Sequence, residues 1–248
     1  MQTMRKIAAV TFDLWDTLIQ DKPRGFDDAA SIRVDGIWKI LTERGMVHTR
    51  DEILSAHVKT GDFIQLTWNK MRDMAVHDQV LFMLTCVDSK LPGKLSREDL
   101  DAIEKVYAEA ILQRPPILLP GARGALESVR SKGYKIGLIS NTGRTPGSML
   151  RIVMDNMGIL EHFDTTTFSN DILIRKPAEG AFRVTLEELK VVPKAAVHIG
   201  DDADSDIAGA KGIGMHALQL VHDGKEGSKI ADAHLKSLEQ VPDCIEKL

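Results

Sequence analysis

The chain has few of the features that mark extracellular or membrane proteins. Only two cysteines, Cys86 and Cys244, occur among its 248 residues. They lie far apart, without a second pair, which suits neither a disulfide framework nor a structural zinc site. The longest apolar run near the start, residues 7–12, is too short to cross a bilayer and precedes no cleavage-like sequence. We therefore expect no membrane partner and no export signal, and a cytoplasmic location.

An excess of charge of one sign is also missing. The chain has 32 basic and 36 acidic residues, with a formal net charge of -4, and the two kinds are interleaved. No basic stripe is therefore available to bind nucleic acid, and we expect no nucleic-acid partner. Aromatic residues make up only 5% of the chain, and no heptad pattern persists. The sequence leaves the oligomeric state undetermined.

What the chain does have is a hydrophobic content of 43%, enough for a sizeable core with a smaller companion. Short, β-rich apolar runs alternate with segments of helical periodicity such as 121–132 and 179–190. This alternation is typical of an α/β fold with a doubly wound parallel sheet. The predicted strands lie at residues 7–12, 135–139, 196–199 and 216–221.

The pattern changes between the first predicted strand and residue 116. Strand-like runs disappear there, and proline and glycine interrupt the pattern at residues 21–25 and 114–116, as expected of linkers. We predict a core formed by residues 1–19 and 117–248 and a smaller all-helical cap formed by residues 20–116. The amphipathic stretches of this cap lie at residues 27–44, 50–70, 78–87 and 97–113.

Polar residues follow three of the predicted strands, and a further basic residue begins the helical segment before the third. In a parallel α/β sheet, ligands bind outside the carboxyl ends of the strands, so these residues are expected to share one site. The side chains concerned are Asp13, Ser140, Asn141, Lys176, Asp201 and Asp206.

With these motifs in this order, the chain resembles the haloacid dehalogenase-like hydrolase superfamily. Its members carry a strand-end aspartate, a strand-end serine or threonine, a lysine and a late acidic motif. The resemblance implies a Rossmann-like core with a helical cap, and a magnesium-dependent hydrolase, a phosphatase acting on a small phosphorylated molecule. It covers nearly the whole chain and rests on residues 13–18, 119–121, 140–143, 175–177, 200–206 and 209–211.

The resemblance also implies a role for each motif. Asp13 would be the nucleophile, because a carboxylate can attack phosphorus and form an aspartyl-phosphate, which splits one hard displacement into two easier steps. A Mg²⁺ ion would neutralise and orient the two anions. Its ligands would be the Asp13 carboxylate, the Trp15 backbone carbonyl and Asp201, with Asp206 holding its water shell.

Substrate binding is assigned in the same way. Lys176 would offset the carboxylates, while the Ser140 hydroxyl and the backbone N–H of Asn141 would hold phosphate oxygens. Thr17 would complete this set by fixing the nucleophile loop.

Trp15 departs from the family pattern, because most phosphatases of the superfamily have a second aspartate there that serves as general acid and base. Either Asp16 or a cap residue supplies the proton, or the substrate, such as an acyl phosphate, needs none. A metal-independent 2-haloacid dehalogenase also carries an aromatic residue there, but that branch does not keep the acidic pair seen here at Asp201 and Asp202. A phosphate-binding or regulatory protein without turnover is the remaining alternative.

Several other polar residues are harder to assign. His198 lies within an apolar strand and is predicted to be a hydrogen-bonded core residue rather than a ligand. We expect Asp204 or Ser205 to cap the helix that follows, and the roles of Asp16 and Asp202 stay open. No motif selects among the cap residues that could face substrate, which are Arg33, Lys59, Trp68, Lys70, Arg72 and His77.

Overall fold

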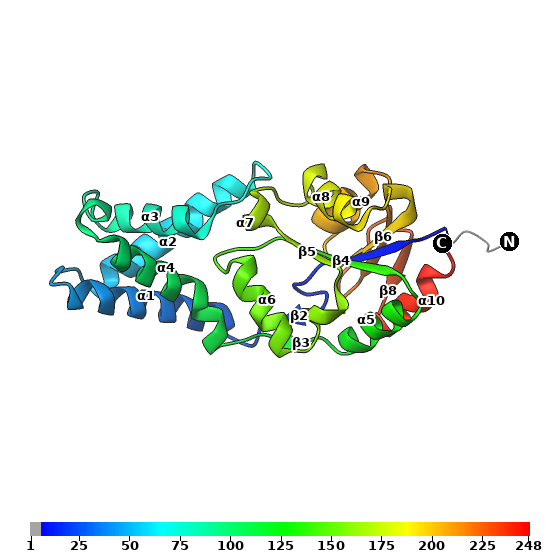
Figure 1. Cartoon of the computed structure of the whole chain (residues 1–248), viewed down its shortest axis with the longest axis horizontal. Helices are drawn as coiled ribbons and strands as arrows, with labels where there is room; N and C mark the ends of the chain where they lie inside the picture. Colours follow the sequence, from blue (N-terminus) through cyan, green and yellow to red (C-terminus); the bar gives the residue numbers. More distant parts are fainter. Residues whose placement is uncertain (1–5) are drawn as a thin grey trace.

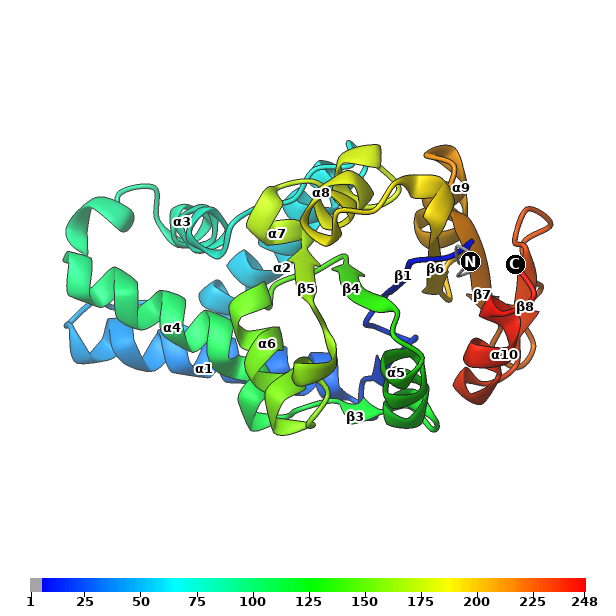
Figure 2. The ribbon, with the colours of Figure 1, turned by 45° about the vertical axis from the view of Figure 1, so that its right-hand side comes forward.

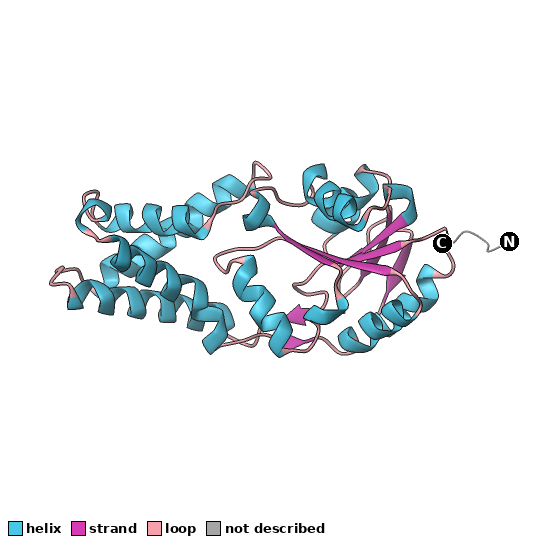
Figure 3. Cartoon of the chain, viewed as in Figure 1, coloured by secondary structure: helices cyan, strands magenta, loops and turns pink. Residues whose placement is uncertain are grey.

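The computed structural model describes residues 6–248, apart from the side chain of Phe26. Six parallel strands form its central sheet, β1 (Ala9–Phe12), β4 (Lys135–Ser140), β5 (Thr165–Phe168), β6 (Ala196–Gly200), β7 (His216–Leu220) and β8 (Ala233–Leu235). They lie in the order β5-β4-β1-β6-β7-β8, seen as the magenta layer of Figure 3. The α/β core predicted from the sequence is thus confirmed.

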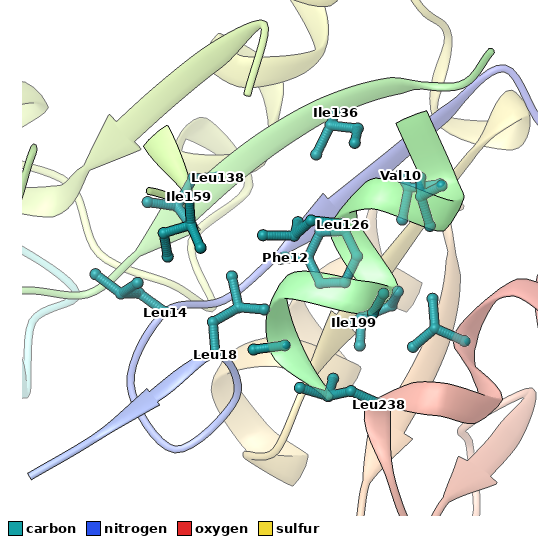
Figure 4. Packing of buried hydrophobic residues seen from close by; sticks show 14 of the residues in the cluster. Val10, Phe12, Leu14, Leu18, Leu126, Ile136, Leu138, Ile159, Ile199 and Leu238 are labelled. Atoms are coloured by element: carbon teal, nitrogen blue, oxygen red, sulfur yellow. The ribbon is translucent and has the colours of Figure 1, made fainter. Parts of the chain in front are cut away.

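Strand β1 lies at the centre of the sheet because all of its side chains are apolar or small and all are buried. It pairs with β4 on one side and β6 on the other, and Val10 stands opposite both Ile136 and Val197. Alternate residues of a strand point to opposite faces of the sheet. Val10 and Phe12 accordingly pack in one hydrophobic cluster (Figure 4), whereas Ala9 packs in another.

Helices cover both faces of this sheet (Figure 1). The larger cluster lies beneath α5 (Ala122–Ser131), α6 (Gly147–Asn156) and α10 (Val241–Ile245), and the smaller beneath α8 (Glu179–Leu189) and α9 (Gly209–Gly212). No helix among residues 6–248 is long and apolar enough to span a bilayer. The short helical elements around the central sheet are α7 (Ser169–Ile172), η2 (Leu160–His162), η3 (Pro193–Ala195), η4 (Ala203–Ala208) and η5 (Leu238–Gln240).

Four further helices form a bundle at one end of the molecule (Figures 1 and 2). They pack around a hydrophobic cluster of their own that includes Ile37, Met83 and Tyr107. Capping boxes at Thr49 and Ser96 fix where the second and fourth of them begin. The elements are α1 (Gly25–Glu43), α2 (Arg50–Trp68), α3 (Val76–Val87), η1 (Pro92–Lys94) and α4 (Arg97–Gln113).

The chain enters and leaves this bundle beside a two-residue antiparallel pair, β2 (Ile19–Gln20) with β3 (Ile117–Leu118). The helices predicted between residues 20 and 116 are confirmed to within two residues at each end. The division into a core of residues 1–19 and 117–248 and a cap of residues 20–116 stays a prediction, and residues 1–5 lie outside the described part. We call α1 to α4 the cap below.

Candidate active site

A buried lysine joins two carboxylates at the carboxyl ends of β1 and β6. The Lys176 Nζ donates to Oδ1 of Asp13 at 2.6 Å, to Oδ1 of Asp206 at 2.6 Å and to the carbonyl of Ile139 at 2.6 Å. These three acceptors use all three hydrogens of the ammonium group. The side chains of Lys176 and Asp206 are almost fully buried. Three residues that lie far apart in the sequence therefore form one charged cluster.

The side chain of Asn141 holds Lys176 in this position. The backbone N–H of Lys176 donates to Oδ1 of Asn141 at 2.9 Å, and Nδ2 of Asn141 donates to the carbonyl of Lys176 at 3.0 Å. This reciprocal pair fixes the backbone from which the lysine side chain extends. Asn141, predicted to bind substrate through its backbone, thus also positions the lysine.

His198 supports Asp206 from inside the sheet. Its Nε2 lies 3.1 Å from Oδ1 of Asp206, and its Nδ1 lies 2.9 Å from Oγ1 of Thr11. Because a carboxylate can only accept, Nε2 carries the proton and the Thr11 hydroxyl donates to Nδ1. Burial lowers the pKa of His198, so the ring is neutral. The prediction of a hydrogen-bonded core histidine is confirmed, and the residue also orients Asp206.

The loop after β6 brings Asp201 to the same place. Asp13, Asp201 and Asp206 each offer an oxygen, and these atoms all lie within 4.8 Å of one another. Carboxylate oxygens at such separations are the donors that hard cations such as Mg²⁺ prefer. Oδ2 of Asp206 also accepts from the backbone N–H of Asp202 at 3.0 Å. The donor set therefore fits a divalent metal.

The protonation states of the cluster fit a cation as well. Burial raises the pKa of Asp13 to about 7, against the opposing effect of Lys176. Burial, followed by the charge of Asp206, raises the pKa of Asp201 to about 6. Burial would also raise the pKa of Asp206, but Lys176 and His198 more than offset it and lower that pKa. A divalent cation held by Asp13 and Asp201 would favour the ionised form of both carboxylates and lower these raised pKa values.

The loop after Asp13 is tight. The backbone N–H of Asp16 donates to the carbonyl of Ile19 at 2.7 Å, and Asp16 has a positive φ of 55°. Thr17 is fully buried, and its hydroxyl has no hydrogen-bond partner among the described residues. Trp15 is half-buried, packs against the larger hydrophobic cluster and lines a cavity. Ser140 is buried at the end of β4, the strand that pairs with β1.

Asp202 has a structural role that the sequence left open. Its Oδ1 accepts from the backbone N–H groups of Asp204 at 3.2 Å and Ser205 at 2.6 Å. The expectation that Asp204 or Ser205 caps this turn is wrong. Asp202 caps it because its extended backbone precedes η4, so its side chain can fold back onto the first N–H groups.

A cavity of about 510 Å³ lies between the cap and the loop after β4. Of the cap residues that could face substrate, Arg33 and Trp68 line it, and none of the other four does. Its wall also includes His57 and Arg144, which the sequence did not single out because neither belongs to a motif.

The cap also contacts the core through Asp73, in the turn after α2. Its Oδ2 accepts from Nη1 of Arg175 at 2.9 Å and from the hydroxyl of Ser169, while its Oδ1 accepts from Nε1 of Trp68 at 3.2 Å. The Arg175 guanidinium lies over the Trp68 ring, 4.0 Å from the ring centre. Asp73 thus fixes the cap against the segment that leads to Lys176.

A family model described as haloacid dehalogenase-like hydrolase matches residues 7–214, a span that contains every predicted site residue. The chain belongs to this family. The superfamily predicted from the motifs is confirmed.

Curated relatives of this haloacid dehalogenase-like hydrolase carry two kinds of name. Haloacid dehalogenase-like hydrolase domain-containing protein 3 of Xenopus laevis is 33% identical over 129 residues, 50% of this chain and 51% of that protein. The chain thus spans about half the length of that relative. The phosphoglycolate phosphatase of Yersinia pseudotuberculosis is 22% identical over 248 residues, 99% of this chain and 91% of the phosphatase.

Solved structures share the fold. The crystal structure of a 2-haloacid dehalogenase from Pseudomonas syringae pv. tomato has a TM-score of 0.70 and 23% identity, covering 97% of this chain and 99% of that chain. At this identity the likeness shows the fold of this haloacid dehalogenase-like hydrolase and not its substrate.

Proposed function

We propose that the chain is a magnesium-dependent phosphatase that hydrolyses a small phosphorylated molecule through an aspartyl-phosphate on Asp13. One observation carries the proposal, the convergence of the carboxylates of Asp13, Asp201 and Asp206 around buried Lys176. A phosphatase-named relative that matches 99% of the chain supports it.

In the first step an oxygen of Asp13 attacks phosphorus, the bond to the leaving oxygen breaks, and the phosphoryl group is transferred to the carboxylate. In the second step water attacks the same phosphorus and the bond between phosphorus and the Asp13 oxygen breaks. Inorganic phosphate leaves with the hydrogens of the water, and the Asp13 carboxylate is restored. Bound Mg²⁺ would supply positive charge between the anions. We propose Asp13, Asp201 and the Trp15 carbonyl as its ligands, with Asp206 acting on its water shell.

The remaining predicted residues receive roles that agree with their positions. Lys176 keeps Asp13 ionised and aimed, because its ammonium group donates to that carboxylate. Ser140 and the backbone N–H of Asn141 hold phosphate oxygens at the end of β4. Thr17 is assigned to fixing the loop, and its buried hydroxyl has no hydrogen-bond partner among the described residues.

Trp15 shapes the choice of leaving group. Its indole has no acidic proton to give to an alkoxide, so general acid catalysis worth about 10²–10⁴ in rate is missing at this position. We propose that acyl and aryl phosphates, which leave as stable anions, are better substrates than alkyl phosphates. Trp15 is also the observation that favours a second candidate, a metal-independent 2-haloacid dehalogenase using the same Asp13.

The test is phosphate release from acetyl phosphate, p-nitrophenyl phosphate and alkyl phosphates, with Mg²⁺ or EDTA. We expect turnover that needs Mg²⁺ and disappears in Asp13→Asn. The matched control is Asp101→Asn on the exposed face of α4, which should keep full activity. Full activity in Asp13→Asn would refute the nucleophile assignment.

Two outcomes would favour the alternatives. Halide release from a short 2-haloacid in EDTA would establish the dehalogenase. Binding of beryllofluoride, a phosphate mimic, without any turnover would establish a binding or regulatory protein.

A further inference from the structure

Two arginines on the wall of the cap cavity have no carboxylate partner. Arg33, on α1, is 5% exposed; its Nε donates to the carbonyl of Tyr107 at 2.8 Å and its Nη2 to the hydroxyl of Thr145 at 3.1 Å. Nη1 of Arg144 donates to the Tyr107 hydroxyl at 2.9 Å. Neither guanidinium forms an ion pair with a carboxylate of residues 6–248. Neutral oxygens satisfy part of each guanidinium, and Cζ of Arg33 lies 5.2 Å from the centre of the Tyr107 ring, but no carboxylate compensates either charge.

The other two arginines of the same cavity are different. Arg114 pairs with Asp28 at 2.7 Å, and Arg175 pairs with Asp73 at 2.9 Å. The chain therefore neutralises Arg114 and Arg175 with carboxylates and leaves Arg33 and Arg144 without one.

The positive charges of Arg33 and Arg144 also repel each other. Burial is the main reason that the pKa of Arg33 is lowered to about 10, and the positive charge of Arg144 lowers it further. Tyr107 acts in the opposite direction and raises this pKa. A buried charge costs free energy unless an opposite charge pairs with it. An anion between the two side chains would relieve both the burial cost and the repulsion.

His57, on α2, lines the same cavity and fits this arrangement. Nη2 of Arg144 donates to the carbonyl of His57 at 2.8 Å. Burial, followed by the charges of Arg144 and Arg33, lowers the pKa of His57 to about 3, so the ring is neutral. Its Nε2 is buried and has no hydrogen-bond partner among the described residues. Asp21 and Asp27 also line the cavity, but neither forms an ion pair with Arg33 or Arg144. Beside these two unpaired cations the wall thus offers one neutral, unsatisfied polar atom, Nε2 of His57.

We propose that Arg33 and Arg144 bind a second anionic group of the substrate, so that the substrate is a small phosphate ester that carries a carboxylate or another phosphate at its far end. This inference rests on the proposed phosphatase function. The cavity borders the reacting end, because Trp15 and Asn141, from the two loops that carry Asp13 and Ser140, line it. The guanidinium fork matches both carboxylate and phosphate oxygens.

The experiment compares pairs of substrates that share a scaffold and differ in the charge at the far end. p-Nitrophenyl phosphate is paired with 4-carboxyphenyl phosphate, because nitro and carboxylate groups have nearly the same shape. 4-Hydroxyphenyl phosphate is paired with hydroquinone bisphosphate, and 2-hydroxyethyl phosphate with 2-phosphoglycolate. The readout is the ratio of kcat/KM within each pair, which we call the charge preference. The carboxylate and bisphosphate pairs distinguish the two anions.

We expect Arg144→Gln to lower the charge preference by about 10- to 100-fold, the usual value of a charge-assisted hydrogen bond. Arg144→Lys keeps the charge and should retain part of the preference. The matched control, Arg97→Gln on the exposed face of α4, should leave the preference at the wild-type value. Equal charge preference in wild type and Arg144→Gln would overturn the proposal.

A binding measurement separates this inference from the proposed function. Malonate, a dicarboxylate, is added to the wild-type protein and to Arg144→Gln in EDTA, and the unfolding midpoint is recorded. We expect wild type to gain about 5 °C at roughly one hundred times Kd and the variant to gain little. If no phosphate ester is hydrolysed, the phosphatase proposal fails, and this shift alone decides the anion site. An unfolding midpoint of the wild type that malonate does not raise would overturn the proposed anion site.

Discussion

The ammonium nitrogen of Lys176 lies 2.6 Å from Oδ1 of Asp13. Solvent reaches only 1% of the lysine side chain and 10% of the aspartate side chain. Water and salt therefore screen the attraction between the two charges very little. The lysine sets the ionisation of the carboxylate that we propose as nucleophile.

Replacing this lysine should change the pH dependence of catalysis. In Lys176→Met the pKa of Asp13 loses its main lowering influence and rises above about 7. We expect kcat/KM to fall by about 100- to 1000-fold and the acid limb of its pH profile to move to higher pH. Rates measured from about pH 5 to about pH 9 check this.

The control for this variant is Lys211→Met. Lys211 does not belong to the Lys176 cluster, and its Nζ lies 2.8 Å from Oδ1 of Asp232. Lys211→Met should keep the wild-type profile. An unshifted acid limb in Lys176→Met would contradict the role given to the lysine.

Asp13 should destabilise the metal-free protein at alkaline pH. Its pKa is raised from 3.8 to about 7, so the folded state binds more protons than the unfolded state between these values. The free energy of unfolding then falls as pH rises through this window. Asp13→Asn removes the ionisation and should raise that free energy by about 1–3 kcal/mol in EDTA at about pH 8. Urea unfolding at about pH 4 and about pH 8 checks the sign.

Magnesium should reverse this difference, because a bound cation stabilises the ionised carboxylate. With saturating Mg²⁺ the wild type should become at least as stable as Asp13→Asn. If Asp13→Asn stays more stable than the wild type at every Mg²⁺ concentration, Asp13 is not a ligand of the metal. Asp101→Asn, on the exposed face of α4, should behave as wild type throughout.

The sequence predicted the parts of the fold that have a strong local pattern. Strand β1 is a continuous buried run, and the capping residues Thr49 and Ser96 mark where two cap helices begin. Strand β5 was not predicted, because its sequence is three threonines and a phenylalanine and half of it is only partly buried at the sheet edge. Burial on both faces produces an apolar run, and an edge strand does not need one.

In the candidate site, too, the residues that belong to a sequence motif were predicted and those without a motif were not. The order of motifs along the chain placed Asp13 and Lys176 together, although they are 163 residues apart. The pair of Asp73 with Arg175, 102 residues apart, has no motif at the cap end and was not predicted. Arg33 and Arg144 likewise share a cavity only because the cap packs on the loop after β4. This packing depends on the whole fold, so the sequence did not predict that the two residues lie together.

The Asp73–Arg175 pair should stabilise the docked cap. Its side chains are 0% and 13% exposed, and removing one partner leaves the other charge buried. We expect Asp73→Ala to lower the free energy of unfolding by about 3–5 kcal/mol. Asp35→Ala, which breaks an exposed pair with Arg50 on the cap, should cost about 1 kcal/mol or less. Equal losses in urea unfolding would show that the Asp73 pair adds no special stability.

Restoring an acid at position 15 should change which phosphate esters react. Trp15→Asp would introduce a carboxyl group into the loop of the nucleophile and let it protonate the leaving oxygen. We expect kcat/KM for an alkyl phosphate to rise by about 10- to 100-fold relative to acetyl phosphate, which needs no proton.

Trp15→Asn is the matched control, because it has nearly the same shape as the aspartate variant and no acidic proton. Both variants lose the indole packing against the larger hydrophobic cluster, so their stabilities should fall together and cancel in the comparison. A gain for alkyl phosphate in Trp15→Asp alone would show that the wild-type tryptophan restricts the enzyme to activated phosphates. The same gain in both variants would show that the indole acts by blocking access to the cavity.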